Sequence, residues 1–121
     1  MGEIRIISER IDPELLARLV RETFVTMVKF VVDLEREKIA IGGELHADGE
    51  AMLLEDGSAS RDLWGANYHP GVGKDQCIVY TAMMNIRPSR GNPAMEVKDP
   101  TIRERIRALT FRLIGEGESL G

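Results

Sequence analysis

Residues 28–43 read VKFVVDLEREKIAIGG, and their pattern gives the clearest indication of the fold. Its β-branched and aromatic residues alternate with Lys29 and Asp33, which is the two-residue period of a β-strand with one apolar face. The charged residues Glu35–Lys38 interrupt the alternation, which resumes over Ile39–Ile41 before a pair of glycines stops it. The pattern therefore predicts a β-hairpin with its turn at the charged residues.

Two amphipathic helices are predicted on either side of the middle of the chain. Each begins with an Asp-Pro pair, at residues 12–13 and 99–100. Asp caps free amide groups, and Pro fits the first helical position because its missing N–H is not needed there. Apolar residues at helical spacing extend the two helices to about Phe24 and Ile114.

The remaining segments complete a mixed pattern. Residues 3–7 alternate weakly and predict a short first strand, whereas residues 46–55 are mainly good helix formers and predict a short helix. Residues 61–69 and 76–87 have extended patterns and are joined by turn-forming residues at 70–75. They predict a second hairpin.

The predicted order of elements is β-α-β-β-α-β-β-α. It indicates an α+β fold in which two hairpins and a leading strand form a largely antiparallel sheet. Both long helices carry one apolar stripe, so we expect them to pack on one face of that sheet. The chain has 121 residues, the length of one domain, and we assign residues 1–121 to a single domain.

The composition is typical of a folded, soluble protein. Hydrophobic residues make up 43% and charged residues 30% of the chain, and no apolar run approaches the roughly 20 residues of a membrane span. The N-terminus lacks the pattern of a secretory signal, so we expect a soluble, cytoplasmic protein that does not bind membranes. The net charge of −4 argues against nucleic-acid binding. The single cysteine, Cys77, excludes an internal disulfide.

The string GGELHADGE, residues 42–50, concentrates carboxylates around a histidine. On a helix, His46 and Glu50 share a face because they are four residues apart. Imidazole and carboxylates suit a divalent metal, so His46, Asp48 and Glu50 form a candidate metal site, and no other cofactor is indicated. The same groups suit general base catalysis, with His46 and Glu50 as catalytic candidates. The alternative is a structural helix start that Asp48 caps.

A second group of polar residues lies in the strings DLWGAN (62–67) and NIRPSRGN (85–92). The guanidinium of Arg87 suits a carboxylate or phosphate, so we expect a small polar or anionic ligand between these strings. The candidate ligand-binding residues are Asp62, Asn67, Asn85, Arg87, Ser89, Arg90 and Asn92. The alternative is that Arg87 pairs internally with Asp62, since the two are neighbours at the open end of the predicted hairpin.

Several of these strings follow one another in a specific order. GGELHAD, LLEDGS, DLWG and NIRPS-GN lie between Val31 and Ile106. In order and spacing, they resemble a family of small uncharacterised prokaryotic proteins, a domain of unknown function. The resemblance implies that the polar strings match the family's own, and it implies no reaction, substrate or cofactor.

Three functions remain open at this point. The first is a small module that binds a small molecule or anion in a cleft lined by the HAD, DLWG and NIRPSRGN strings. The second is a small metal-assisted hydrolase that uses His46 and its neighbouring carboxylates, so whether the protein is an enzyme stays undecided. The third is a structural or interaction protein, in which a methionine-rich patch at Met83, Met84 and Met95 serves a homo-oligomer.

Overall fold

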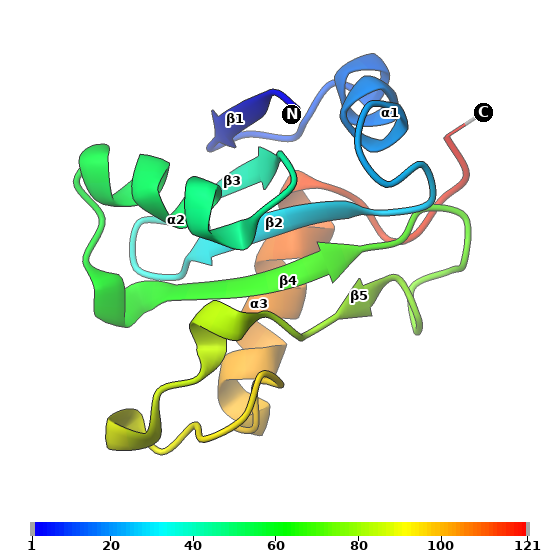
Figure 1. Ribbon diagram of the computed structural model, residues 1–121. Coiled ribbons are helices and arrows are strands. Elements are labelled where there is room, and N and C mark those ends of the chain that lie inside the picture. Colours follow the sequence, from blue (N-terminus) through cyan, green and yellow to red (C-terminus); the bar gives the residue numbers. More distant parts are fainter. Residues whose placement is uncertain (1, 121) are drawn as a thin grey trace.

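The computed structural model describes residues 2–120 and has an α+β fold (Figure 1). These residues form one five-stranded sheet in the order β1-β3-β2-β4-β5, and every neighbouring pair is antiparallel. The strands are β1 (Ile4–Ile7), β2 (Val28–Asp33), β3 (Lys38–Gly42), β4 (Leu63–Tyr68) and β5 (Ile78–Val79). The predicted fold class and the antiparallel sheet are confirmed.

Three α-helices accompany this sheet. They are α1 (Pro13–Arg21), α2 (His46–Glu55) and α3 (Pro100–Leu113). The Asp-Pro pairs act as predicted, because Asp12 and Asp99 accept hydrogen bonds at 2.8 Å from the backbone N–H groups of Glu14 and Thr101. α1 ends at Arg21, earlier than predicted. Within residues 2–120, every helix is too short or too polar to span a membrane.

The turn between β2 and β3 is organised by a buried carboxylate. Asp33 Oδ1 accepts hydrogen bonds from the backbone N–H groups of Glu35 at 3.0 Å and Arg36 at 2.9 Å. The Arg36 guanidinium donates to Asp56 Oδ2 at 2.8 Å and Ser58 Oγ at 2.9 Å, which ties the turn to the end of α2. Asp33 therefore fixes this turn, and Asp56 of the LLEDGS string helps to hold the turn against the end of α2.

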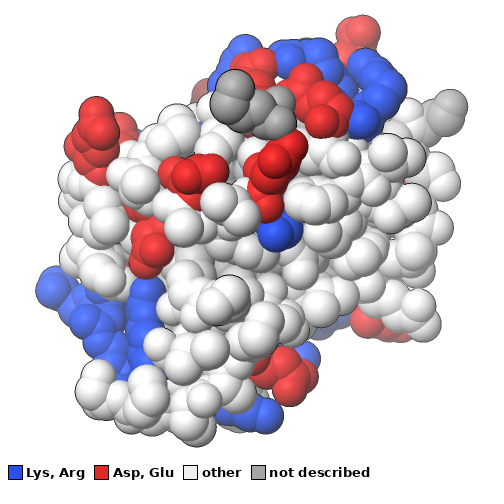
Figure 2. Space-filling model, in the orientation of Figure 1, with Lys and Arg blue, Asp and Glu red and all other residues white. Residues whose placement is uncertain are grey.

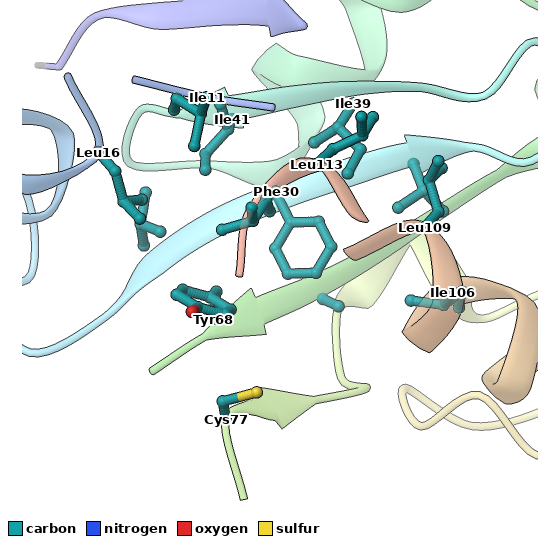
Figure 3. Close-up of a cluster of buried hydrophobic side chains, with 14 of the residues drawn as sticks. Ile11, Leu16, Phe30, Ile39, Ile41, Tyr68, Cys77, Ile106, Leu109 and Leu113 are labelled. Atoms are coloured by element: carbon teal, nitrogen blue, oxygen red, sulfur yellow. The ribbon is translucent and has the colours of Figure 1, made fainter. Parts of the chain in front are cut away.

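The main hydrophobic core lies on one face of the sheet. Val28, Phe30 and Val32 of β2 are buried there, as the alternation predicts. Figure 3 shows the Phe30 ring among side chains of β3, β4 and α3. The helix residues buried in this cluster are Leu16, Leu19 and Val20 of α1 and Ile106, Leu109 and Leu113 of α3.

α2 covers part of the opposite face, and in Figure 1 it lies in front of the sheet while α3 lies behind it. Beneath α2 is a smaller apolar cluster of Val31, Ala40, Leu53 and Leu63. Gly49 in the middle of α2 is buried, and a Cβ there would lie 3.2 Å from Val31 Cγ2. Glycine thus lets the helix approach the sheet closely.

The segment after β5 departs from the prediction. Residues 76–87 do not form one strand, because β5 contains only Ile78–Val79. Residues 80–82 hydrogen-bond instead with residues 95–97, and residues 83–85 form a 3₁₀ turn. The prediction of a long second strand is therefore wrong.

The physical reason is that a side chain takes the place of the missing strand. Asn85 Oδ1 accepts a hydrogen bond from the Gly65 N–H at 2.9 Å, and Asn85 Nδ2 donates to the Gly65 carbonyl at 2.9 Å. The same Nδ2 donates to the carbonyl of Met95 at 3.1 Å. One amide therefore satisfies both backbone groups of Gly65 on the edge of β4, as a peptide group of a neighbouring strand would.

Candidate functional site

A cleft of 680 Å³ lies on the α2 face of the sheet, between the start of α2, β4 and residues 81–84. This volume falls in the range of roughly 300–1,000 Å³ that is typical of small-molecule pockets. We call it the methionine cleft, because Met27, Met83, Met84 and Met95 line it. Its other lining residues are Lys29, Leu45, His46, Ala47, Glu50, Asn67, Thr81 and Ala82. Figure 2 views the molecule from the α2 side and shows a largely uncharged surface.

The imidazole of His46, at the start of α2, packs against β4. Its Nε2 lies 2.8 Å from the carbonyl oxygen of Ala66, and in the Nε2-protonated tautomer this N–H donates to that oxygen. Nδ1 is then the acceptor of the ring. The contact depends on Gly65, because a Cβ there would lie 3.1 Å from His46 Cδ2 and 2.7 Å from Ala82 Cβ. The glycine of the DLWG string therefore has a steric role.

The surroundings of His46 favour the neutral imidazole. Burial is the main cause that lowers the pKa of His46, and the positive charge of Lys29 lowers it further. The hydrogen bond to the Ala66 carbonyl and the nearby side chain of Asn67 act in the opposite direction and offset only part of this shift. At neutral pH the ring therefore offers the cleft a lone pair and no charge.

This pKa shift predicts that stability depends on pH through His46. The unfolded chain takes up a proton at about pH 6.5, before the folded chain does, so the free energy of unfolding falls as the pH drops below that value. We expect His46→Gln to show a shallower fall than wild type. Urea unfolding of the two proteins between about pH 5 and 8 measures this difference. Parallel curves for wild type and His46→Gln would contradict it.

Asn67 and Lys29 add further polar groups to the methionine cleft. Asn67 Nδ2 donates to the carbonyl of Thr81 at 3.4 Å, and Asn67 Oδ1 is buried with no hydrogen-bond partner among residues 2–120. The ammonium of Lys29 lies 5.0 Å from the centre of the Phe24 ring. The cleft thus contains an unsatisfied acceptor and a cation close to His46.

Arg87 lies beside the cleft, and its ionic partner differs from the predicted one. Its Nη2 is 3.7 Å from Glu50 Oε2, and its guanidinium is 5.3 Å from the centre of the Trp64 ring. The predicted alternative, an ion pair with Asp62, is not formed; in the described part of the chain, Glu50 is the carboxylate within ion-pair distance. Glu50 therefore borders both the methionine cleft and Arg87.

Asn92, like Asn85, uses its amide inside the protein. The side chain is 3% exposed and bonds three backbone carbonyls and one backbone N–H. The partners are the carbonyls of Asn85 (2.7 Å), Ala94 (2.9 Å) and Glu96 (3.0 Å) and the N–H of Lys98 (2.8 Å). These two asparagines of the NIRPSRGN string hold the loop in place, and their amides do not line the cleft.

The other predicted ligand-binding residues are dispersed. Asp62 is half-buried in the 3₁₀ turn before β4, and Ser89 and Arg90 are exposed in the turn Pro88–Arg90. Of the predicted site residues, those that line the cleft are His46, Glu50 and Asn67. His46 and Ala47 of the HAD string and Asn67, which follows the DLWG string, thus meet at the cleft, whereas the NIRPSRGN string lies next to it.

The predicted metal ligands do not form a complete set. Across residues 2–120, no three His, Cys, Asp or Glu side chains are placed together to hold a metal ion. Asp48 is exposed, and the Glu50 carboxylate faces Arg87.

The sequence analysis did not predict that methionines line the cleft. The chain contains six methionines, and four of them line the cleft. For three of the four, Met83, Met84 and Met95, the sequence predicts only a methionine-rich patch that serves a homo-oligomer. The signal in the sequence is that the chain has six methionines while only 5% of its residues are aromatic. Flexible methionines can line a pocket in place of aromatic rings.

A search of the curated proteins and a search of the solved structures each found no match to the chain. A scan against protein families matched residues 5–113 to the family described as "Protein of unknown function (DUF5674)". The match begins within β1, at Arg5, and continues through the other four strands and all three helices of the described residues. The chain therefore belongs to this DUF5674 family.

Proposed function

We propose that the protein binds a small amphipathic molecule in the methionine cleft. The observation that carries this proposal is one cleft of 680 Å³ that combines apolar walls with a polar group around His46. Pockets of this size, mostly apolar with a few convergent polar groups, are typical of small-molecule sites.

The apolar part of the ligand is expected to contact the methionines and Leu45. Met83 is 74% exposed, Leu45 57% and Met95 42%, so these side chains leave water when a ligand covers them. Methionine side chains have several rotatable bonds and adapt to differently shaped apolar surfaces. This favours a flexible or irregular hydrocarbon body.

The polar end of the ligand is expected to face His46, Asn67 and Lys29. Neutral His46 offers an acceptor at Nδ1, Asn67 Oδ1 lacks a partner within the described residues, and Lys29 supplies a positive charge. A polar group that both donates a hydrogen bond and carries partial or full negative charge fits this set. The predicted ligand class therefore narrows from any small polar or anionic molecule to one that also has an apolar body.

The fluorescent probe 1-anilinonaphthalene-8-sulfonate tests the proposal, because it joins apolar rings to an anionic group. We expect saturable fluorescence enhancement by wild type. Ala47→Trp fills the cleft and is expected to weaken binding at least about tenfold, which corresponds to about 1.4 kcal/mol. Ala51→Trp, one turn further along α2 and outside the lining, is the matched control.

Near-ultraviolet circular dichroism of each variant shows that the folded protein, and not a loosely packed state, binds the probe. No saturable binding by wild type, or equal affinities of both tryptophan variants and wild type, would remove the proposal.

A further inference from the structure

Arg87 lies farther from its carboxylate partner than Arg18 and Arg36 lie from theirs. Arg18 lies 2.6 Å from Glu3 and Arg36 lies 2.8 Å from Asp56, the distances of charge-assisted hydrogen bonds. Arg87 approaches Glu50 only to 3.7 Å. Its Nη1 is buried and has no hydrogen-bond partner among residues 2–120. A planar group with several donors is thus left largely unsatisfied.

The surroundings of this guanidinium are unfavourable for a cation. The Arg87 side chain is only 12% exposed, and burial together with the charge of Arg90 lowers its pKa. Glu50 opposes these effects from its distance of 3.7 Å. The face of Trp64 provides the remaining attraction, 5.3 Å away. A second negative charge next to the guanidinium would therefore stabilise the charged form of Arg87.

The backbone around Arg87 is held in one conformation. Its N–H donates to the carbonyl of Asn92 at 2.6 Å, and the N–H of Asn92 donates back to the Arg87 carbonyl at 3.1 Å. The N–H of Arg90 also donates to the Arg87 carbonyl, at 2.9 Å, which keeps the two arginines in one tight turn. The backbone of this loop does not have to be ordered when a ligand binds, so less conformational entropy is lost.

Arg90 itself is exposed, and within the described residues no hydrogen bond or ion pair holds its side chain. Its side chain is therefore able to reorient toward an anion that binds beside Arg87. Figure 2 shows Lys and Arg side chains gathered at the lower left, below the start of β4, with acidic residues above them. An anion approaching from solvent meets positive charge there.

We propose that Arg87 and Arg90 form an oxyanion site, which accepts a phosphate or a carboxylate group. Arg87 supplies the planar pair of donors that matches either group, and Arg90 supplies a second cation that closes over it. The site is separate from the methionine cleft, and it does not depend on the ligand proposed there. Glu50 borders both and is the carboxylate that a bound anion would supplement.

Inorganic phosphate and acetate are the probes, each titrated at fixed ionic strength with chloride as the balancing anion. Chemical-shift changes of the arginine Nε–H groups report binding, and thermal unfolding reports stabilisation. We expect saturable binding of phosphate, acetate or both by wild type, and the comparison shows which oxyanion is preferred. Arg87→Lys is expected to weaken binding at least about tenfold, because an ammonium cannot form two parallel hydrogen bonds to one group.

Two further variants make the result specific. Arg90→Gln is expected to weaken binding as well, whereas Arg21→Gln, which replaces an exposed arginine at the end of α1, is expected to leave binding unchanged. Binding of 1-anilinonaphthalene-8-sulfonate at the wild-type affinity by Arg87→Lys shows that the fold and the methionine cleft are intact. No preference of wild type for phosphate or acetate over chloride, or equal binding by Arg87→Lys, would overturn the site.

Discussion

Replacing Asn92 with Ala is expected to lower the free energy of unfolding by about 3 kcal/mol or more, since each buried polar group left without a partner costs about 1–3 kcal/mol. The substitution would leave three carbonyls and one N–H without the hydrogen bonds that the Asn92 amide now makes to them. The effect is larger than that of an ordinary surface change, which stays within about 0.5 kcal/mol. Urea unfolding of wild type and variant measures it.

Asn92→Asp is the control for this result. It keeps the size of the side chain and the acceptor for the Lys98 N–H, and it replaces the donor that faces three carbonyls with an oxygen. A loss as large as that of Asn92→Ala would assign the effect to hydrogen bonding and not to packing. If Asn92→Ala changed stability by less than about 1 kcal/mol, the loop would not depend on this amide.

Gly65→Ala is expected to damage both stability and ligand binding. Its Cβ would lie 2.7 Å from Ala82 Cβ, 3.0 Å from Met84 Sδ and 3.1 Å from His46 Cδ2, so these neighbours have to move. Overpacking of this kind costs about 1–3 kcal/mol. Because the three displaced residues line the methionine cleft, the affinity for 1-anilinonaphthalene-8-sulfonate is expected to fall as well.

The double variant Gly65→Ala/Ala82→Gly tests whether the closest contact is the cause. It removes the methyl group that lies nearest to the new Cβ, so we expect it to recover part of the stability and of the probe affinity. Thermal unfolding and the fluorescence titration give both values. A double variant that is worse than Gly65→Ala in both measurements would show that the contact with Ala82 is not limiting.

The elements that the sequence predicts well are those that depend on near neighbours. The hairpin of residues 28–43 has a turn that Asp33 organises from two and three residues away, and Asp12 and Asp99 cap their own helices. Periodicity and capping are local properties, so they can be read without knowing the rest of the fold.

Residues 76–87 do not form the predicted strand, because their partners are distant in sequence and partly side chains. Asn85 bonds Gly65, twenty residues away, and no strand pattern indicates that an amide will replace a strand. The same limit applies to the candidate site. His46 and Asn67 could be named from their types, but the methionine walls and the pairing of Arg87 with Glu50 follow only from the three-dimensional arrangement.

The amide of Asn85 also determines how the sheet ends. An exposed edge strand presents unpaired N–H and carbonyl groups that can recruit a strand of another molecule and start aggregation. On β4 the N–H and the carbonyl of Gly65 are both occupied by one buried side chain, which is 0% exposed. A strand of another molecule therefore has no free donor or acceptor to bond at Gly65. The Asn85 side chain thus protects this position of the edge, where no neighbouring strand covers it.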